Sequence, residues 1–68
     1  MRLKQLRKAK GLSQQRLATD LNTNQNTISR YETGERQPSI DELIRIADYF
    51  NVSVDYLLER TDCPKLQR

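Results

Sequence analysis

Five polar side chains lie close together near the middle of the chain. Gln25 and Asn26 carry amides, Thr27 and Ser29 carry hydroxyls, and Arg30 carries a guanidinium. Amides and hydroxyls both donate and accept hydrogen bonds, and a guanidinium presents its donors in a fixed planar fork. These groups can therefore recognise another polar surface. The alternative is an ordinary polar helix face that contacts only solvent.

The composition excludes several kinds of catalytic and metal site. The chain has no histidine and one cysteine, Cys63, so it cannot form a His–Cys metal site or a Ser–His or Cys–His nucleophile pair. Five carboxylates fall where helix caps or solvent-facing positions are expected, with no convergent site: Asp41, Glu42, Asp48, Asp55 and Glu59. We therefore expect no enzyme activity, no metal and no cofactor.

The size of the chain and its one cysteine indicate its class and location. A chain of 68 residues makes one domain with a modest core. Cys63 has no disulfide partner within the chain, which suits a reducing cytosol. No apolar run approaches the ~20 residues that span a bilayer, and there is no signal-peptide pattern. We expect a cytoplasmic protein with no membrane contact.

Charge is distributed unevenly along the chain, whose formal net charge is +3. Residues 1–36 hold eight basic and three acidic side chains, whereas residues 37–68 hold four basic and six acidic ones. The first half could therefore attract a polyanion. A solvated charged surface, as on most small proteins, is the alternative that charge alone leaves open.

Local start and stop signals predict five short helices and no strand. The predicted helices cover residues 1–10, 14–21, 25–33, 40–50 and 54–59 or 54–60. Gly11 ends the first helix, and Ser13 caps the second. Asn22 tolerates the left-handed conformation that a sharp turn between helices needs. Asn24 then caps the third helix, and Gly34 ends it.

The fourth helix is expected to carry the largest apolar face. Ser39 and Glu42 match a capping box at its start, and Ser53 repeats the start signal for the fifth helix. The residues expected to face inward are Leu17, Ala18 and Leu21 on the second helix, Ile28 and Tyr31 on the third, and Ile40, Leu43, Ile44, Ala47 and Phe50, with Ile46 beside them, on the fourth. The sequence thus predicts an all-α domain over residues 1–60, followed by an irregular tail over residues 61–68.

The order and spacing of several residues resemble a known family. The residues that carry the likeness are Ser13-Gln14, Leu17-Ala18, Ile28-Ser29, Tyr31-Glu32, Gly34, Pro38-Ser39 and Val52-Ser53-Val54-Asp55-Tyr56-Leu57-Leu58. Over about residues 3–60 the chain is similar to the helix-turn-helix domains of phage repressors and Cro proteins, also called the xenobiotic-response-element family. The family implies a five-helix, lambda-repressor-like DNA-binding domain whose third helix lies in the DNA major groove. Asn22 departs from the glycine more usual there.

The resemblance implies roles for individual polar residues. The residues implied to contact DNA bases are Gln25, Asn26 and Arg30, with Thr27 and Ser29 nearby. Glutamine and asparagine amides can bind adenine through two hydrogen bonds, and arginine can bind guanine in the same way. The residues implied to contact phosphates are Gln14 and Asn24, with Arg16, Arg36, Gln37 and Lys10 as further candidates. Operators and docking angles vary within the family.

Two further features bear on the structure around these residues. Arg7 and Glu32 match positions that form an ion pair between the first helix and the end of the third, which would orient the third helix. Leu57 and Leu58 are adjacent, so burying both in one small core is difficult. One of them would then join a dimer interface with Val54 or Tyr56, and the alternative is a fifth helix that only packs inward.

These implications favour a sequence-specific regulator of transcription, most simply a repressor that occupies a promoter. The family resemblance favours a homodimer that binds a palindromic site in double-stranded DNA, with half-sites about 34 Å apart. The competing expectation is an antitoxin, which binds a partner protein as well as its own promoter. A toxin or an anti-repressor is thus a further candidate partner.

Overall fold

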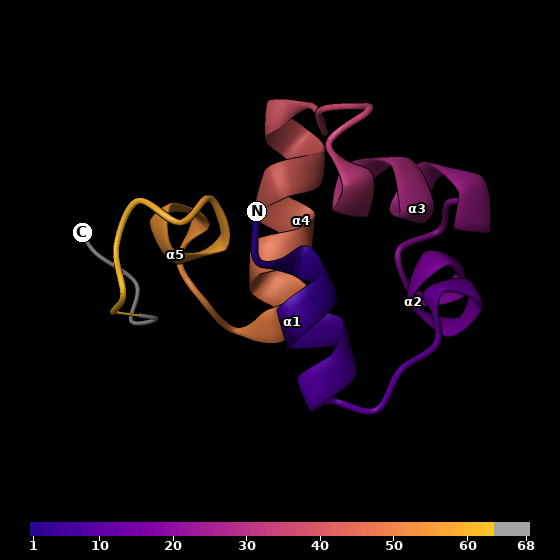
Figure 1. Cartoon of the computed structure of the whole chain (residues 1–68), viewed down its shortest axis with the longest axis horizontal. Helices are drawn as coiled ribbons and strands as arrows, with labels where there is room; N and C mark the ends of the chain where they lie inside the picture. The colour runs from indigo at the N-terminus through magenta and orange to yellow at the C-terminus, as the bar shows by residue number, and fades with distance from the viewer. Residues whose placement is uncertain (64–68) are drawn as a thin grey trace.

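Five α-helices form the regular structure of residues 1–63, the part of the chain that the computed structural model describes. They are α1 (Leu3–Ala9), α2 (Gln14–Asp20), α3 (Gln25–Thr33), α4 (Ile40–Phe50) and α5 (Val54–Leu57). Residues 1–63 contain no strand, so the predicted all-α class is confirmed. Figure 1 shows α4 near the middle, with α5 on one side and α2 and α3 on the other.

Side-chain caps fix where four of the helices begin. The caps are Ser13, Asn24, Ser39 and Ser53, whose side-chain oxygens accept a hydrogen bond from the backbone N–H three residues further along. Such a cap typically contributes about 1 kcal/mol to stability. The predicted starts of α2, α3, α4 and α5 are therefore confirmed.

Residues in the left-handed conformation follow α1, α3 and α4 and form the turn between α2 and α3. Asn22 has a φ of 58° and Gly34, after α3, has a φ of 83°. A Cβ at Gly34 would meet nothing within 4 Å, so glycine is favoured there by its backbone conformation alone. After α4, Asn51 has a φ of 55°. The predicted role of Asn22 in the turn is confirmed.

The fifth helix is shorter than predicted. It ends at Leu57 rather than at residue 59 or 60. Glu59 takes a φ of 64°, and the Arg60 N–H donates back to the Asp55 carbonyl over 2.8 Å. This arrangement closes the helix end, and neither a glycine nor an asparagine marks it in the sequence. Residues 61–63 of the predicted tail contain no helix, and residues 64–68 lie outside the described part.

The core draws on all five helices. Its buried apolar members are Leu3, Leu17, Ala18, Leu21, Ile28, Tyr31, Ile46, Ala47, Phe50, Val52 and Leu57. The residues predicted to face inward on α2 and α3 are among them, as expected. Because α3 contributes only Ile28 and Tyr31, its position depends on the helices around it.

Two predicted inward positions on α4 are wrong. Ile40 is 76% exposed and Ile44 is 46% exposed, whereas Ile46 is fully buried. Apolar residues occupy more than one side of α4, and packing selects the side that carries Ile46, Ala47 and Phe50. Sequence periodicity could not make this choice, because it depends on where the other helices lie.

The predicted capping box of α4 is only half formed. The Ser39 hydroxyl oxygen accepts from the Glu42 N–H over 3.2 Å, as expected. The Glu42 carboxylate does not reach back to the start of the helix. Its Oε2 lies 3.5 Å from Arg45 Nη1, and its buried Oε1 has no hydrogen-bond partner among the described residues.

The N-terminal segment is fixed against α5. The Arg2 N–H donates to the Leu57 carbonyl over 2.8 Å, and Arg2 Nε donates to the Tyr56 carbonyl over 2.9 Å. The Arg2 guanidinium also lies over the Tyr56 ring, 4.4 Å from its centroid. Among the described residues, no helix is long and apolar enough to cross a membrane.

Candidate nucleic-acid interface

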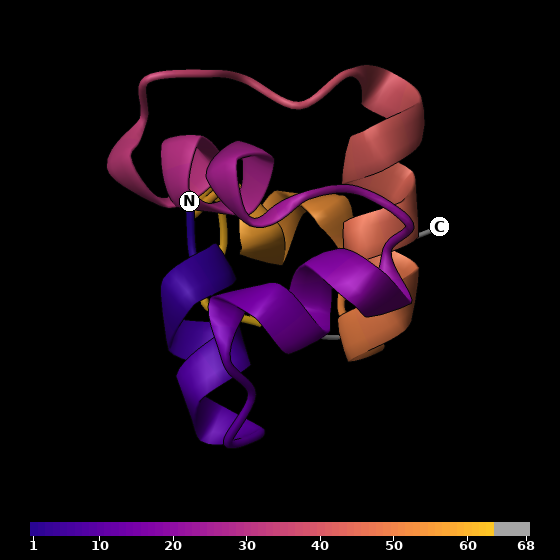
Figure 2. The ribbon, with the colours of Figure 1, turned by 90° about the vertical axis from the view of Figure 1, so that its right-hand side faces the viewer.

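Helices α2 and α3 pack against each other at a large angle. Figure 1 shows α3 lengthwise and α2 nearly end-on, and the view turned by 90° in Figure 2 shows the reverse. Ala18, which is 2% exposed, is a small side chain in the core between helices, beside the fully buried Leu17 and Ile28. This is the arrangement of a helix-turn-helix, in which a short turn joins two crossed helices.

One side of α3 is open to solvent. Gln25, Asn26 and Arg30 are exposed, Ser29 is half-buried, and Thr33 is exposed on the same side by its helical spacing. Ile28 and Tyr31 hold the opposite side in the core. The structure therefore presents four of the five predicted base-contacting side chains together. Thr33 was not among the predicted residues, although its spacing from Ser29 and Arg30 could have indicated it.

Thr27, the fifth predicted base-contacting residue, is engaged in the cap of α3. Its hydroxyl donates to Asn24 Oδ1 over 3.0 Å, and its backbone N–H donates to the same oxygen over 2.9 Å. Asn24 therefore uses its carbonyl oxygen within the domain. Its side-chain NH₂ has no hydrogen-bond partner among the described residues and is exposed, so it can donate to an anion.

A buried ion pair joins α1 to α3. Arg7 Nε donates to Glu32 Oε2 over 2.7 Å, and Arg7 Nη2 donates to Glu32 Oε1 over 3.3 Å. The exposed fractions of the two side chains are 11% and 3%. Arg7 Nη1 also donates to the Leu12 carbonyl over 2.7 Å. This pair therefore ties the end of α3 to α1 and to the loop after it.

The ion pair extends through a chain of amides to the start of α3. Gln14 is the first residue of α2, and its Nε2 donates to Glu32 Oε1 over 3.0 Å. Gln25 is the first residue of α3, and its Nε2 donates to Gln14 Oε1 over 3.4 Å. The sequence indicates separate contacts for Gln14 and Gln25, and no spacing in it shows that the two amides are connected.

The pKa of the Glu32 carboxyl lies below its ordinary value of 4.5. Burial by itself raises this pKa, because it disfavours the charged form. Hydrogen bonds from Arg7 and Gln14, together with the charges of Arg7 and Lys4, outweigh burial and lower it. Glu32 is therefore a carboxylate at neutral pH.

The remaining phosphate candidates differ in their surroundings. The Arg16 side chain is 67% exposed, and its Nε lies 3.2 Å from Asp20 Oδ1. The Arg36 N–H closes the loop after α3 by donating to the Arg30 carbonyl over 3.3 Å, and its side chain is exposed. Lys10 Nζ lies 5.8 Å from the centroid of the Tyr49 ring, so it contacts an aromatic surface of α4 within the domain.

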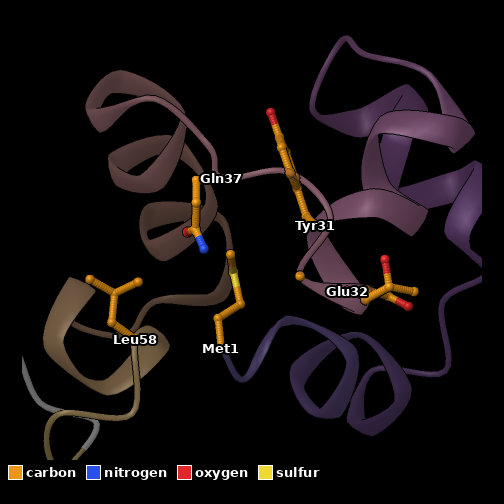
Figure 3. A pocket seen from close by; sticks show the side chains of 7 residues that line it. Met1, Tyr31, Glu32, Gln37 and Leu58 are labelled. Atoms are coloured by element: carbon orange, nitrogen blue, oxygen red, sulfur yellow. The ribbon is translucent and has the colours of Figure 1, made fainter.

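Gln37 is exposed, and it also lines a cavity. The cavity has a volume of about 330 Å³ and is lined by Met1, Tyr31, Glu32, Thr33, Gly34, Gln37 and Leu58. Figure 3 shows the Glu32 carboxylate directed away from Met1 and Leu58. Both of its oxygens are bound by Arg7 or Gln14, so Glu32 gives the cavity no free anion.

The predicted dimer residues fall into two groups. Leu57 is fully buried in the core, so it cannot contact a partner surface, and its place in the predicted dimer interface is wrong. Val54, Tyr56 and Leu58 are half-buried and remain partly accessible. The two adjacent leucines thus divide: Leu57 packs inward and Leu58 faces the surface. The Tyr56 ring is also partly covered by Arg2.

Comparison with known proteins agrees with this geometry. A model of the helix-turn-helix family matches residues 3–57. The HTH-type transcriptional regulator ImmR of Bacillus subtilis (strain 168) is 39% identical over 64 residues, which is 94% of this chain and 50% of that protein. The cryptic phage CTXphi transcriptional repressor RstR of Vibrio cholerae is 34% identical over 59 residues, 87% of this chain and 53% of that protein.

A third relative is described as an activator. The HTH-type transcriptional activator BcrR of Enterococcus faecalis is 39% identical over 57 residues, 84% of this chain and 28% of that protein. This chain thus spans about half the length of ImmR and RstR, and less of BcrR. No solved structure matches significantly. The match to the family model covers most of the chain, which belongs to the helix-turn-helix family of the Cro and phage-repressor type.

Proposed function

We propose that this chain binds double-stranded DNA as part of a transcriptional regulator, with α3 in the major groove. The observation that carries the proposal is the division of α3 into two sides. Ile28 and Tyr31 anchor one side in the core, and the other presents Gln25, Asn26 and Arg30 to solvent. These side chains have the donors and acceptors that distinguish base edges in the major groove.

Phosphate contacts would position α3 in the groove. The first backbone N–H groups of a helix favour an anion, and Asn24 adds a free side-chain NH₂ at the start of α3. Gln14, Arg16 and Arg36 are the further candidates. Gln37, which is exposed, is also a candidate, whereas Lys10 is a weaker one because its ammonium contacts the Tyr49 ring.

A two-fold dimer would read a palindromic site. We propose that the accessible parts of Val54, Tyr56 and Leu58 contribute to its interface. Half-sites would then lie about 34 Å apart, one turn of the double helix. Repression by occupying a promoter is the simplest mode of action, and the relative RstR carries the name of a repressor. BcrR carries the name of an activator, so the mode is a proposal that promoter assays must decide.

The test is a selection of binding sites from random duplex DNA at several salt concentrations. A palindromic consensus with half-sites one helical turn apart would support a dimer that reads sequence. Equal binding to all sequences, with affinity that only falls steeply as salt rises, would contradict sequence-specific recognition. Co-purification of a second small protein would instead favour the antitoxin alternative.

A further inference from the structure

The chain of hydrogen bonds from Glu32 to Gln25 has a direction. A carboxylate can only accept hydrogen bonds, whereas a glutamine amide accepts at its oxygen and donates at its nitrogen. The side of the Gln14 amide that faces Glu32 must therefore be its NH₂, as the 3.0 Å contact between Nε2 and Oε1 shows. This leaves the oxygen of Gln14 directed toward Gln25.

The same reasoning determines the orientation of the Gln25 amide. Because Gln14 offers an oxygen to Gln25, the group that Gln25 turns toward it must be the NH₂. At 3.4 Å this is the weaker of the two links. Gln25 then keeps one N–H and its carbonyl oxygen free. A donor beside an acceptor is the pair that binds N7 and the amino group of adenine.

We propose that Glu32, although it does not touch DNA, sets the hydrogen-bond polarity of the Gln25 amide through Gln14 and thereby the base that Gln25 selects. This inference rests on the proposed function, because it assumes that Gln25 contacts a base. Glu32 is thus a positioning residue for specificity as well as a partner of Arg7. Its low pKa supports this role, since a carboxylate remains an acceptor over the whole neutral range.

Replacing Glu32 by glutamine should reverse the direction of the hydrogen bonds that lead from residue 32 through Gln14 to Gln25. Arg7 Nε, which makes the shorter of the two Arg7 bonds, would hold the new side-chain oxygen, so the NH₂ would face Gln14 and displace the longer contact from Arg7 Nη2. The Gln14 oxygen would then accept from residue 32. The Gln14 NH₂ would donate to the side-chain oxygen of Gln25. Gln25 would present two N–H donors outward. Two donors match the N7 and O6 acceptors of guanine rather than adenine.

Two other variants separate polarity from packing. Gln14→Met keeps the length of the side chain but removes both hydrogen bonds, so the Gln25 amide is no longer held in one orientation. Arg7→Ala removes the partner of Glu32 but leaves a carboxylate that still only accepts. The Gln25 amide should then keep its polarity, even though the fold is weakened.

The experiment selects binding sites from random duplex DNA at pH 8 with the original chain, Glu32→Gln, Gln14→Met and Arg7→Ala. At the base that Gln25 contacts, the preference for adenine over guanine should fall roughly fivefold or more in Glu32→Gln. The preference for adenine should become smaller without reversing in Gln14→Met, and it should persist in Arg7→Ala. Unchanged preference in a folded Glu32→Gln variant would overturn the inference. If that variant does not fold, unchanged preference in Gln14→Met overturns it.

A measurement without DNA tests the hydrogen-bond relay, meaning the bonds from Glu32 through Gln14 to Gln25, on its own. The side-chain amide protons of Gln14 and Gln25 can be followed by ¹⁵N NMR. The Gln14 N–H that faces the carboxylate should be shifted downfield, and Glu32→Gln should remove that shift. An unchanged Gln14 signal would contradict the relay. No sequence preference in the original chain, together with the expected NMR change, would instead refute the proposed function and leave the relay intact.

Discussion

Asn24 accepts two hydrogen bonds from Thr27, from the backbone N–H over 2.9 Å and from the hydroxyl over 3.0 Å. Both bonds end on the Asn24 side-chain oxygen. The NH₂ of Asn24 takes no part in them and is the group that would donate to a phosphate. One residue at the start of α3 thus holds the helix with one atom and can contact DNA with another.

Substitutions at Asn24 should separate these two roles. Asn24→Asp keeps an oxygen for the cap but replaces the NH₂ by a second oxygen and adds negative charge, so stability should be retained while DNA affinity falls. Asn24→Ala removes the cap and should lower the free energy of unfolding by about 1 kcal/mol. Urea denaturation and DNA titration measure the two effects. Full DNA affinity in Asn24→Asp would exclude a phosphate contact.

Arg7 should matter more for stability than for sequence preference. Arg7→Ala leaves the Glu32 carboxylate buried without its charged partner, which typically costs about 3 kcal/mol or more. A domain of this size is stable by only about 3 to 10 kcal/mol, so much of the stability would be lost. Lys8→Ala, at an exposed neighbouring position of α1, is the matched control. Arg7→Ala with unchanged melting temperature but altered base preference would contradict this prediction.

Stability should decrease in acid, in part because of Glu32. The folded-state pKa of Glu32 is below its ordinary value of 4.5, so the folded state favours the carboxylate. This contribution is complete above pH 4.5 and is lost as the pH falls through the folded-state pKa. Asp20, hydrogen-bonded by Tyr49, and Glu59, hydrogen-bonded by the N-terminal ammonium, have lowered pKa values and act in the same direction.

A comparison with Glu32→Gln isolates the contribution of Glu32 to the loss of stability in acid. The variant cannot titrate at residue 32, so its free energy of unfolding should fall less between pH 5 and pH 3 (about the acidic range in which carboxyl groups protonate). Urea denaturation at each pH gives both curves. Parallel curves for the two proteins would show that Glu32 has the same pKa in the folded and unfolded chains.

Local signals in the sequence predicted most of the fold. The bounds of α3 and α4 were correct, because Asn24, Gly34 and Ser39 act on their own neighbouring backbone. The end of α5 was missed, because it depends on the left-handed conformation of Glu59, a residue that rarely adopts it. Caps and turns are short-range features, and a sequence displays them directly.

Contacts between helices were harder to foresee. The exposure of Ile40 and Ile44 depends on which side of α4 the other helices cover. The Tyr49 hydroxyl donates to Asp20 over 2.6 Å across 29 positions of the chain, and no local spacing indicates that bond. The family resemblance predicted the ion pair between Arg7 and Glu32. The hydrogen bonds from Glu32 through Gln14 to Gln25 are visible only in the three-dimensional structure.

Leu57 and Leu58 should respond differently to substitution. Leu57 is fully buried, so Leu57→Ala should lower the free energy of unfolding by about 2 to 5 kcal/mol. Leu58→Asp should leave the fold largely intact but weaken self-association by placing a charge in the proposed interface. Sedimentation equilibrium measures the dimer, and circular dichroism measures the fold. If Leu58→Asp self-associates as strongly as the original chain, the interface lies elsewhere.

Removing a phosphate contact should change the salt dependence of DNA binding. Arg36 follows α3 with an exposed side chain, and its replacement by alanine should reduce the slope of log affinity against log salt by about 0.9. Arg60→Ala removes the same charge from the segment after α5, which Figure 1 shows on the other side of α4 from α3. Because both variants lose one positive charge, a change in slope for Arg36→Ala alone would indicate contact rather than net charge. Equal slopes in the two variants would remove Arg36 from the proposed interface.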